Sequence, residues 1–158
     1  MFNLINKNSP TLRQKAEQFD FNDPPFDPIE FAHNIVKFMY DNNALGIAGP
    51  QIGLSQRVFA MRGHPENFVC FNPRIIDYGE KQIYLEEGCL TFPNLVLKVK
   101  RPQNIKVRFQ MPNSEVVTHK FSGITARIFQ HEYDHLEGIL FTSRANRYHL
   151  EKGLKKGS

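Results

Sequence analysis

The chain has 158 residues, enough for one domain with its own hydrophobic core, and we expect residues 1–158 to form a single domain. Its 41% hydrophobic and 23% charged content is ordinary for a soluble globular protein, and its net charge of +4 is too small to indicate specific nucleic-acid recognition. No apolar run is long enough to span a bilayer, and polar residues interrupt residues 1–15, so neither a membrane span nor a signal peptide is predicted. We therefore expect a cytoplasmic protein that works as a monomer.

Two helices are predicted in the first third of the chain. Ser9 and Pro10 form a typical helix start, and we expect a short helix over residues 10–18. After a proline-rich loop, a second helix is expected over residues 28–42. Its apolar residues recur at helical spacing, which predicts that one face packs on the core; they are Phe31, Ile35, Phe38 and Met39.

Residues 44–53 form a segment of small and apolar residues in which Gln51 has the one strongly hydrogen-bonding side chain. Gly46 and Gly49 lack a Cβ atom, so the backbone of a ligand could approach the chain closely there. Taken alone, the segment is better explained as a turn between a helix and a strand.

The middle of the chain has the composition of strands. We predict strands over residues 57–61, 68–71, 74–78, 82–84, 95–101, 105–110 and 115–121. Asn72-Pro73 is expected to end one strand, and Gly79 to turn a hairpin between two others. Cys70 lies in an apolar run, which predicts a buried thiol that behaves as a small hydrophobe.

Residues 122–138 are predicted to form a helix with a His-Glu-x-x-His motif. His131 and His135 are four residues apart, so their imidazoles lie on one helical face, where they can chelate a metal ion. Glu132 would lie beside the open side of the metal, where it can move protons to and from a water molecule. The alternative is a buried helix whose two histidines make ordinary hydrogen bonds.

A third metal ligand has to come from elsewhere, and Cys89 is the best candidate. It follows the flexible Gly88 and precedes a turn, so its sulfur can face a ligand site. A thiolate with two imidazoles suits a divalent transition metal. Strands between Cys89 and His131 could return the chain over the helix. The sequence thus predicts an α+β fold in which antiparallel strands pack around a central metal-binding helix.

Three segments, within residues 45–141, together resemble the peptide deformylase family. Members of that family have, in this order, a glycine-rich segment ending in Gln, a Glu-Gly-Cys-Leu motif and a Gln-His-Glu-x-Asp-His motif. The second motif is present at residues 87–90 and the third at residues 130–135. The first motif is commonly Gly-hydrophobic-Gly-hydrophobic-Ala-Ala-x-Gln in the family. This chain departs from it, because Ala44 replaces the first Gly and Gly49 replaces the second Ala.

The resemblance implies one catalytic domain that removes the N-formyl group from the initiating methionine of a nascent peptide and releases formate. Cys89, His131 and His135 would hold the metal, and Glu132 would act as general base and acid. Because family members are known as ferrous enzymes, Fe²⁺ is implied, although Zn²⁺, Ni²⁺ and Co²⁺ also suit these ligands.

The resemblance also implies how the formylated peptide is held. The Gln51 amide and the backbone N–H of Leu90 would stabilise the oxyanion. Gly46 and its neighbours would pair with the peptide as an additional strand. A pocket for the methionine side chain would have Glu87 at its edge and apolar walls, which are Leu45, Ile124 and Ile128.

Two other classes of protein remain open at this point. A zinc endopeptidase shares His-Glu-x-x-His but usually takes a third His or Glu downstream, for which His149 and Glu151 are the candidates. The second class is a deformylase-like protein that binds its ligand without catalysis, although such a protein would not need Glu132 and Gln51.

The chain continues only a short way past His135, whereas typical bacterial deformylases extend into a longer C-terminal helix. We expect the basic residues of this tail to be solvated, with a transient contact to ribosomal RNA as the functional alternative. Few apolar residues follow Leu150, so the tail is expected to contribute little to the core. The basic residues are Arg144, Arg147, Lys152, Lys155 and Lys156.

Overall fold

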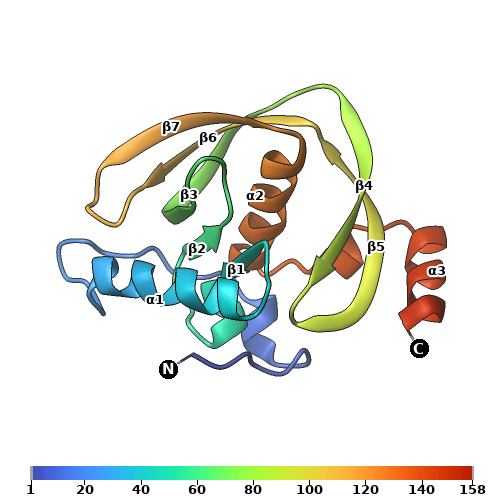
Figure 1. Cartoon of the computed structure of the whole chain (residues 1–158), viewed down its shortest axis with the longest axis horizontal. Coiled ribbons are helices and arrows are strands. Elements are labelled where there is room, and N and C mark those ends of the chain that lie inside the picture. The colour runs from blue at the N-terminus through green and yellow to red at the C-terminus, as the bar shows by residue number, and fades with distance from the viewer. Residues whose placement is uncertain (1, 158) are drawn as a thin grey trace.

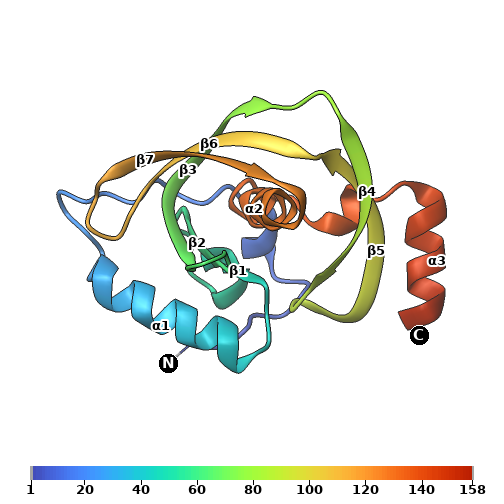
Figure 2. The same ribbon diagram turned by 45° about the horizontal axis from the view of Figure 1, so that its top comes forward.

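The computed structural model describes residues 2–157. Helix α2 (Gly123–Leu136) lies at the centre, with strands around it and the helices α1 and α3 outside (Figure 1). Figure 2 looks nearly along α2 and shows the strands encircling it. This arrangement confirms the predicted α+β fold with antiparallel strands around a central helix.

The larger of the two sheets has the strand order β1-β2-β3-β6-β7, and each neighbouring pair is antiparallel. Apolar side chains from this sheet pack against Phe129 and Leu136 of α2 and form the main core. The sheet therefore holds one side of α2 in place. The bounds of its strands are Gly46–Ala48 (β1), Val58–Met61 (β2), Phe68–Tyr78 (β3), Asn104–Gln110 (β6) and Val116–Ser122 (β7).

Strands β4 (Gln82–Cys89) and β5 (Phe92–Pro102) form a separate antiparallel pair. Buried apolar residues of β5 pack with the short 3-10 helix η3 (Phe141–Ser143). Helix α3 (Arg147–Gly157) lies beside β5 at the edge of the molecule (Figure 1). This pair of strands brings the end of β4 close to α2.

Helix α1 (Pro28–Asp41) packs on β1 and β2 through a second apolar cluster. The Asp27 carboxylate caps it by accepting hydrogen bonds from the backbone N–H groups of Ile29 at 2.9 Å and Glu30 at 3.3 Å. Two short 3-10 helices, η1 (Pro10–Arg13) and η2 (Gly49–Ile52), complete the N-terminal half. Among residues 2–157, no helix has the length and apolar character needed to cross a membrane.

The predicted helix over residues 10–18 is wrong beyond its first turn, because only Pro10–Arg13 is helical. The Ala16 N–H donates to the Leu136 carbonyl at 2.8 Å, and the Glu17 N–H donates to the Ser55 carbonyl at 2.9 Å. These two N–H groups therefore donate to carbonyls far away in the sequence and not to the carbonyls of a preceding helical turn.

The predicted strand end at Asn72-Pro73 and the hairpin around Gly79 are also wrong. Strand β3 continues through Asn72-Pro73 with a shift in register between Phe71 and Arg74. The Asn72 side chain stabilises this irregularity by bonding to the backbone of Phe19, at 2.7 Å to its N–H and 2.9 Å to its carbonyl. After Gly79 the chain passes to the other sheet, so β3 pairs with β6 while β4 pairs with β5.

The C-terminal segment contributes more to the core than its composition predicts. Gly153 is buried, and a Cβ atom there would meet the Leu97 side chain and lie 2.8 Å from the Val96 carbonyl. Leu150 packs against the same apolar cluster, whereas Leu154 is 53% exposed. The prediction that the tail contributes little to the core is therefore wrong for the face of α3 that contacts β5.

Candidate active site

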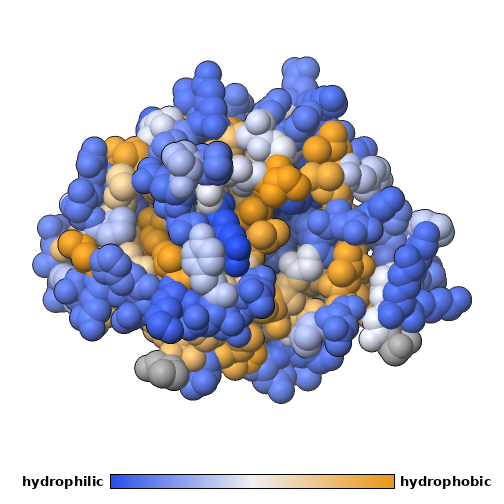
Figure 3. Space-filling model, in the orientation of Figure 1, coloured by the Kyte–Doolittle hydropathy of each residue, from blue (hydrophilic) through white to orange (hydrophobic). Residues whose placement is uncertain are grey.

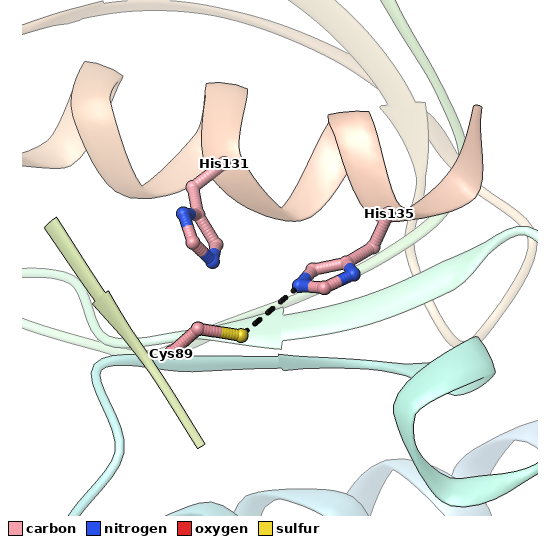
Figure 4. Close-up of side chains that lie close together, drawn as sticks. All are labelled: Cys89, His131 and His135. Carbon is pink, nitrogen blue, oxygen red and sulfur yellow. Dashed lines mark hydrogen bonds between the residues drawn. The ribbon is translucent and has the colours of Figure 1, made fainter. Parts of the chain in front are cut away.

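Helix α2 presents His131 and His135 from successive turns, and both side chains point the same way (Figure 4). The helix follows Ser122, whose backbone is extended, and the chain turns away at Gly138, which has a φ of 73°. Both histidines are buried, with 7% and 1% of their surface exposed. The fold therefore holds two imidazoles inside the protein on one face of a packed helix.

Cys89 ends strand β4 and meets these two histidines from the opposite side (Figure 4). The β4–β5 register shifts between Gly88 and Cys89, where the pair closes into its turn. Cys89 Sγ lies 3.5 Å from His135 Nε2, and the ligand atoms of the three residues all lie within 4.8 Å of one another. Sulfur and imidazole ligands stand about 2.0–2.3 Å from a bound zinc ion, so this spacing fits a single transition metal ion.

Glu87, the residue expected at the edge of the methionine pocket, is bound to His131. Its Oε1 lies 2.8 Å from His131 Nδ1, and its side chain is 3% exposed. A carboxylate only accepts hydrogen bonds when ionised, so His131 donates from Nδ1 and directs Nε2 towards the cluster. Burial opposes ionisation of Glu87, but hydrogen bonds from His131 and Arg101 hold its pKa well below the usual range.

The two histidines have opposite electrostatic surroundings. Burial alone would lower the pKa of His131, but hydrogen bonding to Cys89 and Glu87 raises it to about 10. Burial, followed by the charge of His131, lowers the pKa of His135 well below its usual value. A metal ligand must be a neutral imidazole, so a metal ion held by His131 would compete with a proton for this ring.

Glu132 lies beside the cluster, inside the protein. It is 4% exposed, and burial raises the pKa of its carboxyl group to about 7. Among residues 2–157, its Oε1 is a buried oxygen without a protein hydrogen-bond partner. This carboxylate therefore has a free acceptor position next to the three ligand atoms, as a group that handles protons requires.

The Gln51 side chain is fixed between β1 and the turn after β4. Its Oε1 accepts from the Ala48 N–H at 2.9 Å. Its Nε2 donates to Thr91 Oγ1 at 3.1 Å and to Cys89 Sγ at 3.3 Å. Thr91 directly follows the Glu-Gly-Cys-Leu motif, and its hydroxyl accepts this hydrogen bond from the amide. One N–H of Gln51 is thus directed at the cluster.

A cavity of about 400 Å³ opens over the cluster. Apolar side chains gather in the middle of the face where β1, the start of α2 and β5 lie (Figure 3). Leu45 and Ile124, which are 57% and 60% exposed, form the rim of the cavity, whereas Ile128 is buried in its wall. Every residue predicted for the site except His135 lines this cavity, namely Leu45, Gly46, Gln51, Glu87, Cys89, Leu90, Ile124, Ile128, His131 and Glu132.

The two departures from the family's first motif have different consequences. Ala44 is almost fully buried and lines the cavity, so its methyl group changes the shape of the wall. Gly49 is not part of that wall. A Cβ atom at Gly49 would lie 2.8 Å from the Leu54 carbonyl, so this chain has no room for the Ala that the family commonly has there.

Two buried arginines behind Glu87 were not predicted. Arg101 donates to Glu87 from Nε at 2.6 Å and from Nη2 at 3.0 Å. Arg127 Nη1 donates to the same carboxylate at 2.8 Å. The sequence does contain a signal for Arg101, because it continues the inward-facing alternation of Leu97 and Val99 in β5. A charge in such a position requires a buried partner.

The alternative third ligands of a zinc endopeptidase lie elsewhere. His149 packs against Tyr84 with the rings tilted and their centroids 5.4 Å apart, and Glu151 pairs with Arg147 on α3. Within the part of the chain that the structure describes, the possible metal-binding group is the one formed by Cys89, His131 and His135. Three such ligands and a buried carboxylate at the floor of a cleft define the site of a metal-dependent hydrolase.

Comparison with known proteins identifies the family. The sequence model described as Polypeptide deformylase matches residues 1–151. The chain is 38% identical over 149 residues to the peptide deformylase of Thermotoga petrophila, covering 92% of this chain and 89% of that protein. It is 37% identical over 150 residues to the chloroplastic/mitochondrial peptide deformylase 1B of Arabidopsis thaliana, covering 89% of this chain and 53% of that protein.

Solved structures agree with this result. The crystal structure of the Thermotoga maritima peptide deformylase has a TM-score of 0.87 and 33% identity, over 92% of this chain and 98% of that one. A Synechococcus elongatus peptide deformylase in complex with actinonin has a TM-score of 0.90 and 30% identity, over 99% of this chain and 86% of that one. The chain belongs to the peptide deformylase family. It is a metal-binding hydrolase with peptide deformylase activity, which implies a formyl-methionyl peptide as substrate.

Proposed function

We propose that Cys89, His131 and His135 hold one divalent transition metal ion, and that Glu132 moves the protons of the deformylation reaction. The observation that carries this proposal is the convergence of three ligand atoms within 4.8 Å beside a buried carboxylate. The reaction releases formate and leaves a peptide with a free N-terminal methionine.

An ion held by these residues would supply Lewis-acid chemistry, which lowers the pKa of water towards neutrality and polarises a carbonyl group. Fe²⁺ is the proposed ion in the cell, and Zn²⁺, Ni²⁺ or Co²⁺ would also fit one sulfur and two nitrogen ligands. Glu87 would support the site by fixing the tautomer of His131. This role is distinct from the expected one at the edge of the methionine pocket.

Glu132 would take a proton from the attacking water and deliver one to the leaving amine. Its Oε1 makes no protein hydrogen bond among the described residues, so it is available to these two partners in turn. Burial excludes bulk water from the carboxylate, which keeps the proton transfer within the site.

Gln51 and Leu90 would stabilise the oxyanion that forms from the formyl carbonyl. The Gln51 amide is anchored through Ala48 and Thr91, and its Nε2 lies 3.3 Å from Cys89 Sγ, beside the position of the reacting group. A donor fixed in this way needs little reorganisation when charge develops on the oxygen. The backbone N–H of Leu90, next to Cys89 in the cavity wall, is the proposed second donor.

The peptide would bind along β1, which is an edge strand of the larger sheet. Gly46 allows close approach of the peptide backbone, and the edge offers it hydrogen-bonding groups. The methionine side chain would enter the cavity against Ile128, with Leu45 and Ile124 at the rim.

The proposed setting is the cytoplasm, with the protein acting as a monomer on peptides as they leave the ribosome. The exposed side chain of Arg147 and the neighbouring basic residues of α3 support a weak, salt-sensitive contact with ribosomal RNA. The relative in Arabidopsis thaliana is chloroplastic/mitochondrial, so fractionation of cells of the source organism is the test of location.

One experiment tests the reaction and excludes both rival classes. A short formyl-methionyl peptide and its unformylated twin are incubated with the metal-loaded protein, and formate and backbone fragments are measured. We expect formate from the first peptide and no fragments from either. Backbone cleavage of either peptide would support an endopeptidase, and binding of the peptide without any product would support a binding protein.

A further inference from the structure

A continuous ion-pair network runs from His131 to the C-terminal segment. Its path passes through His131, Glu87, Arg101, Asp134 and Arg144, and Arg127 joins it as a side branch at Glu87. Glu87 binds His131 and takes two hydrogen bonds from Arg101. Arg101 also donates from Nη1 to Asp134 Oδ2 at 2.8 Å. Asp134 accepts two further bonds from Arg144, both at 3.0 Å.

The inner members of this network are buried and the last one reaches the surface. The side chains of Glu87, Arg101 and Asp134 are 3%, 6% and 8% exposed, whereas that of Arg144 is 45% exposed. A buried charge that loses a partner has to shift towards another one or recruit water. Arg101 bridges two carboxylates, so a shift of Asp134 would be passed on to Glu87.

We propose that Asp134 and Arg144 are positioning residues for the metal centre. The proposal rests on His131 being a metal ligand, as set out above. Arg144 holds Asp134 with both arms of its guanidinium fork, Asp134 orients Arg101, and through Glu87 this sets the orientation of the His131 ring. The segment that follows α2 packs on β5. Through Arg144 it thereby also controls the geometry of the metal site.

The test compares Arg144→Gln and Arg144→Lys with the parent protein, each loaded with one metal ion per chain. Three quantities are measured: the rate of metal loss to a chelator, kcat and KM for a formyl-methionyl peptide, and the midpoint of thermal unfolding. Arg108→Gln is the matched control, because this exposed arginine lies outside the network and bonds to Thr118 at 3.3 Å.

We expect Arg144→Gln to lose metal about tenfold faster than the parent. This is the smaller of the effects usually seen when a group that orients a metal ligand is changed. Its kcat should fall while KM stays unchanged, because substrate contacts are retained. Arg144→Lys should recover part of the loss, since an ammonium keeps the charge but not the two-armed geometry. Arg108→Gln should behave as the parent.

A second comparison separates positioning from a purely structural role. Glu87→Gln breaks the network next to His131, so adding Arg144→Gln to it should not accelerate metal loss further. Additive effects would overturn the proposal, as would a folded Arg144→Gln with parental metal loss and kcat, even if its unfolding midpoint falls. If Arg144→Gln does not fold, Arg144→Lys decides by the same measurements. Failure of the parent to retain metal would instead contradict the ligand assignment.

Discussion

Gly46 and Glu132 lie so close that no side chain fits between them. A Cβ atom at Gly46 would stand 2.7 Å from Glu132 Oε2 and 2.9 Å from the Cδ and Cγ atoms of the same residue. Gly46 belongs to β1 and Glu132 to α2. The backbone of the edge strand thus forms one wall of the space in which the proposed catalytic carboxylate stands.

Gly46→Ala should therefore lower kcat for a formyl-methionyl peptide by roughly tenfold to a hundredfold, because the new methyl group displaces the carboxylate. Metal content should remain at one ion per chain, since Gly46 supplies no ligand atom. The control is the same substitution in a Glu132→Gln background, where it should cost nothing more. A further loss in that background would mean that the methyl group acts on the peptide instead.

Glu132→Gln alone should keep the metal and lose about two to four orders of magnitude in kcat, the usual contribution of a positioned acid or base. Glutamine preserves the size of the side chain but cannot accept the proton. Elemental analysis and single-turnover formate release on the same preparation provide the measurement. Parental turnover in a metal-loaded sample would show that another group moves the proton.

The central helix could be predicted closely because its signals are local. The sequence predicts residues 122–138, and the structure has Gly123–Leu136, with Gly138 in the left-handed conformation that ends it. The pairing of strands was harder to predict from the sequence. Nothing near Gly79 indicates that its N–H bonds to the Asn104 carbonyl at 2.8 Å and not within a local hairpin. Such partners are distant in sequence, and tertiary contacts decide between them.

The two thiols should differ in reactivity. Cys70 is fully buried, and burial raises the pKa of its thiol well above the usual value, so it stays protonated and shielded. Cys89 is half-buried at the cavity. A thiol reagent near pH 8 should label neither cysteine in the metal-loaded protein, Cys89 alone after metal removal, and both after denaturation. Mass spectrometry of digested samples locates the label, and labelling of Cys70 in the folded protein would contradict its burial.

Gly153→Ala should destabilise the protein by about 1–3 kcal/mol, the usual cost of overpacking a well-packed site. The added methyl group would press on Leu97 and on the Val96 carbonyl and lift α3 from β5. Alanine is the better helix former by about 1 kcal/mol, so a loss of stability isolates the clash. Denaturant unfolding provides the measurement, and unchanged or increased stability would show that α3 is not held against β5.

The candidate site shows the same division between local and distant signals. The spacing of His131 and His135 is readable from the sequence, and Cys89 is indicated by its position between Gly88 and a turn and by the resemblance to a family. The ion-pair network behind them joins four segments, so only the fold reveals that Arg101 and Asp134 share a buried contact. Arg144 was expected to be a solvated tail residue, and its two bonds to Asp134 depend on where α2 ends.

The metal content of two cysteine variants after dialysis tests the proposed metal centre most directly. Cys89→Ser replaces the proposed thiolate ligand by a neutral hydroxyl, so it should lose its metal and be nearly inactive. Cys70→Ser buries a hydroxyl without a partner, which should cost about 1–3 kcal/mol of stability but leave one metal ion per chain. Elemental analysis of both variants gives the answer. One metal ion per chain retained by Cys89→Ser but lost by Cys70→Ser would contradict the proposed metal centre.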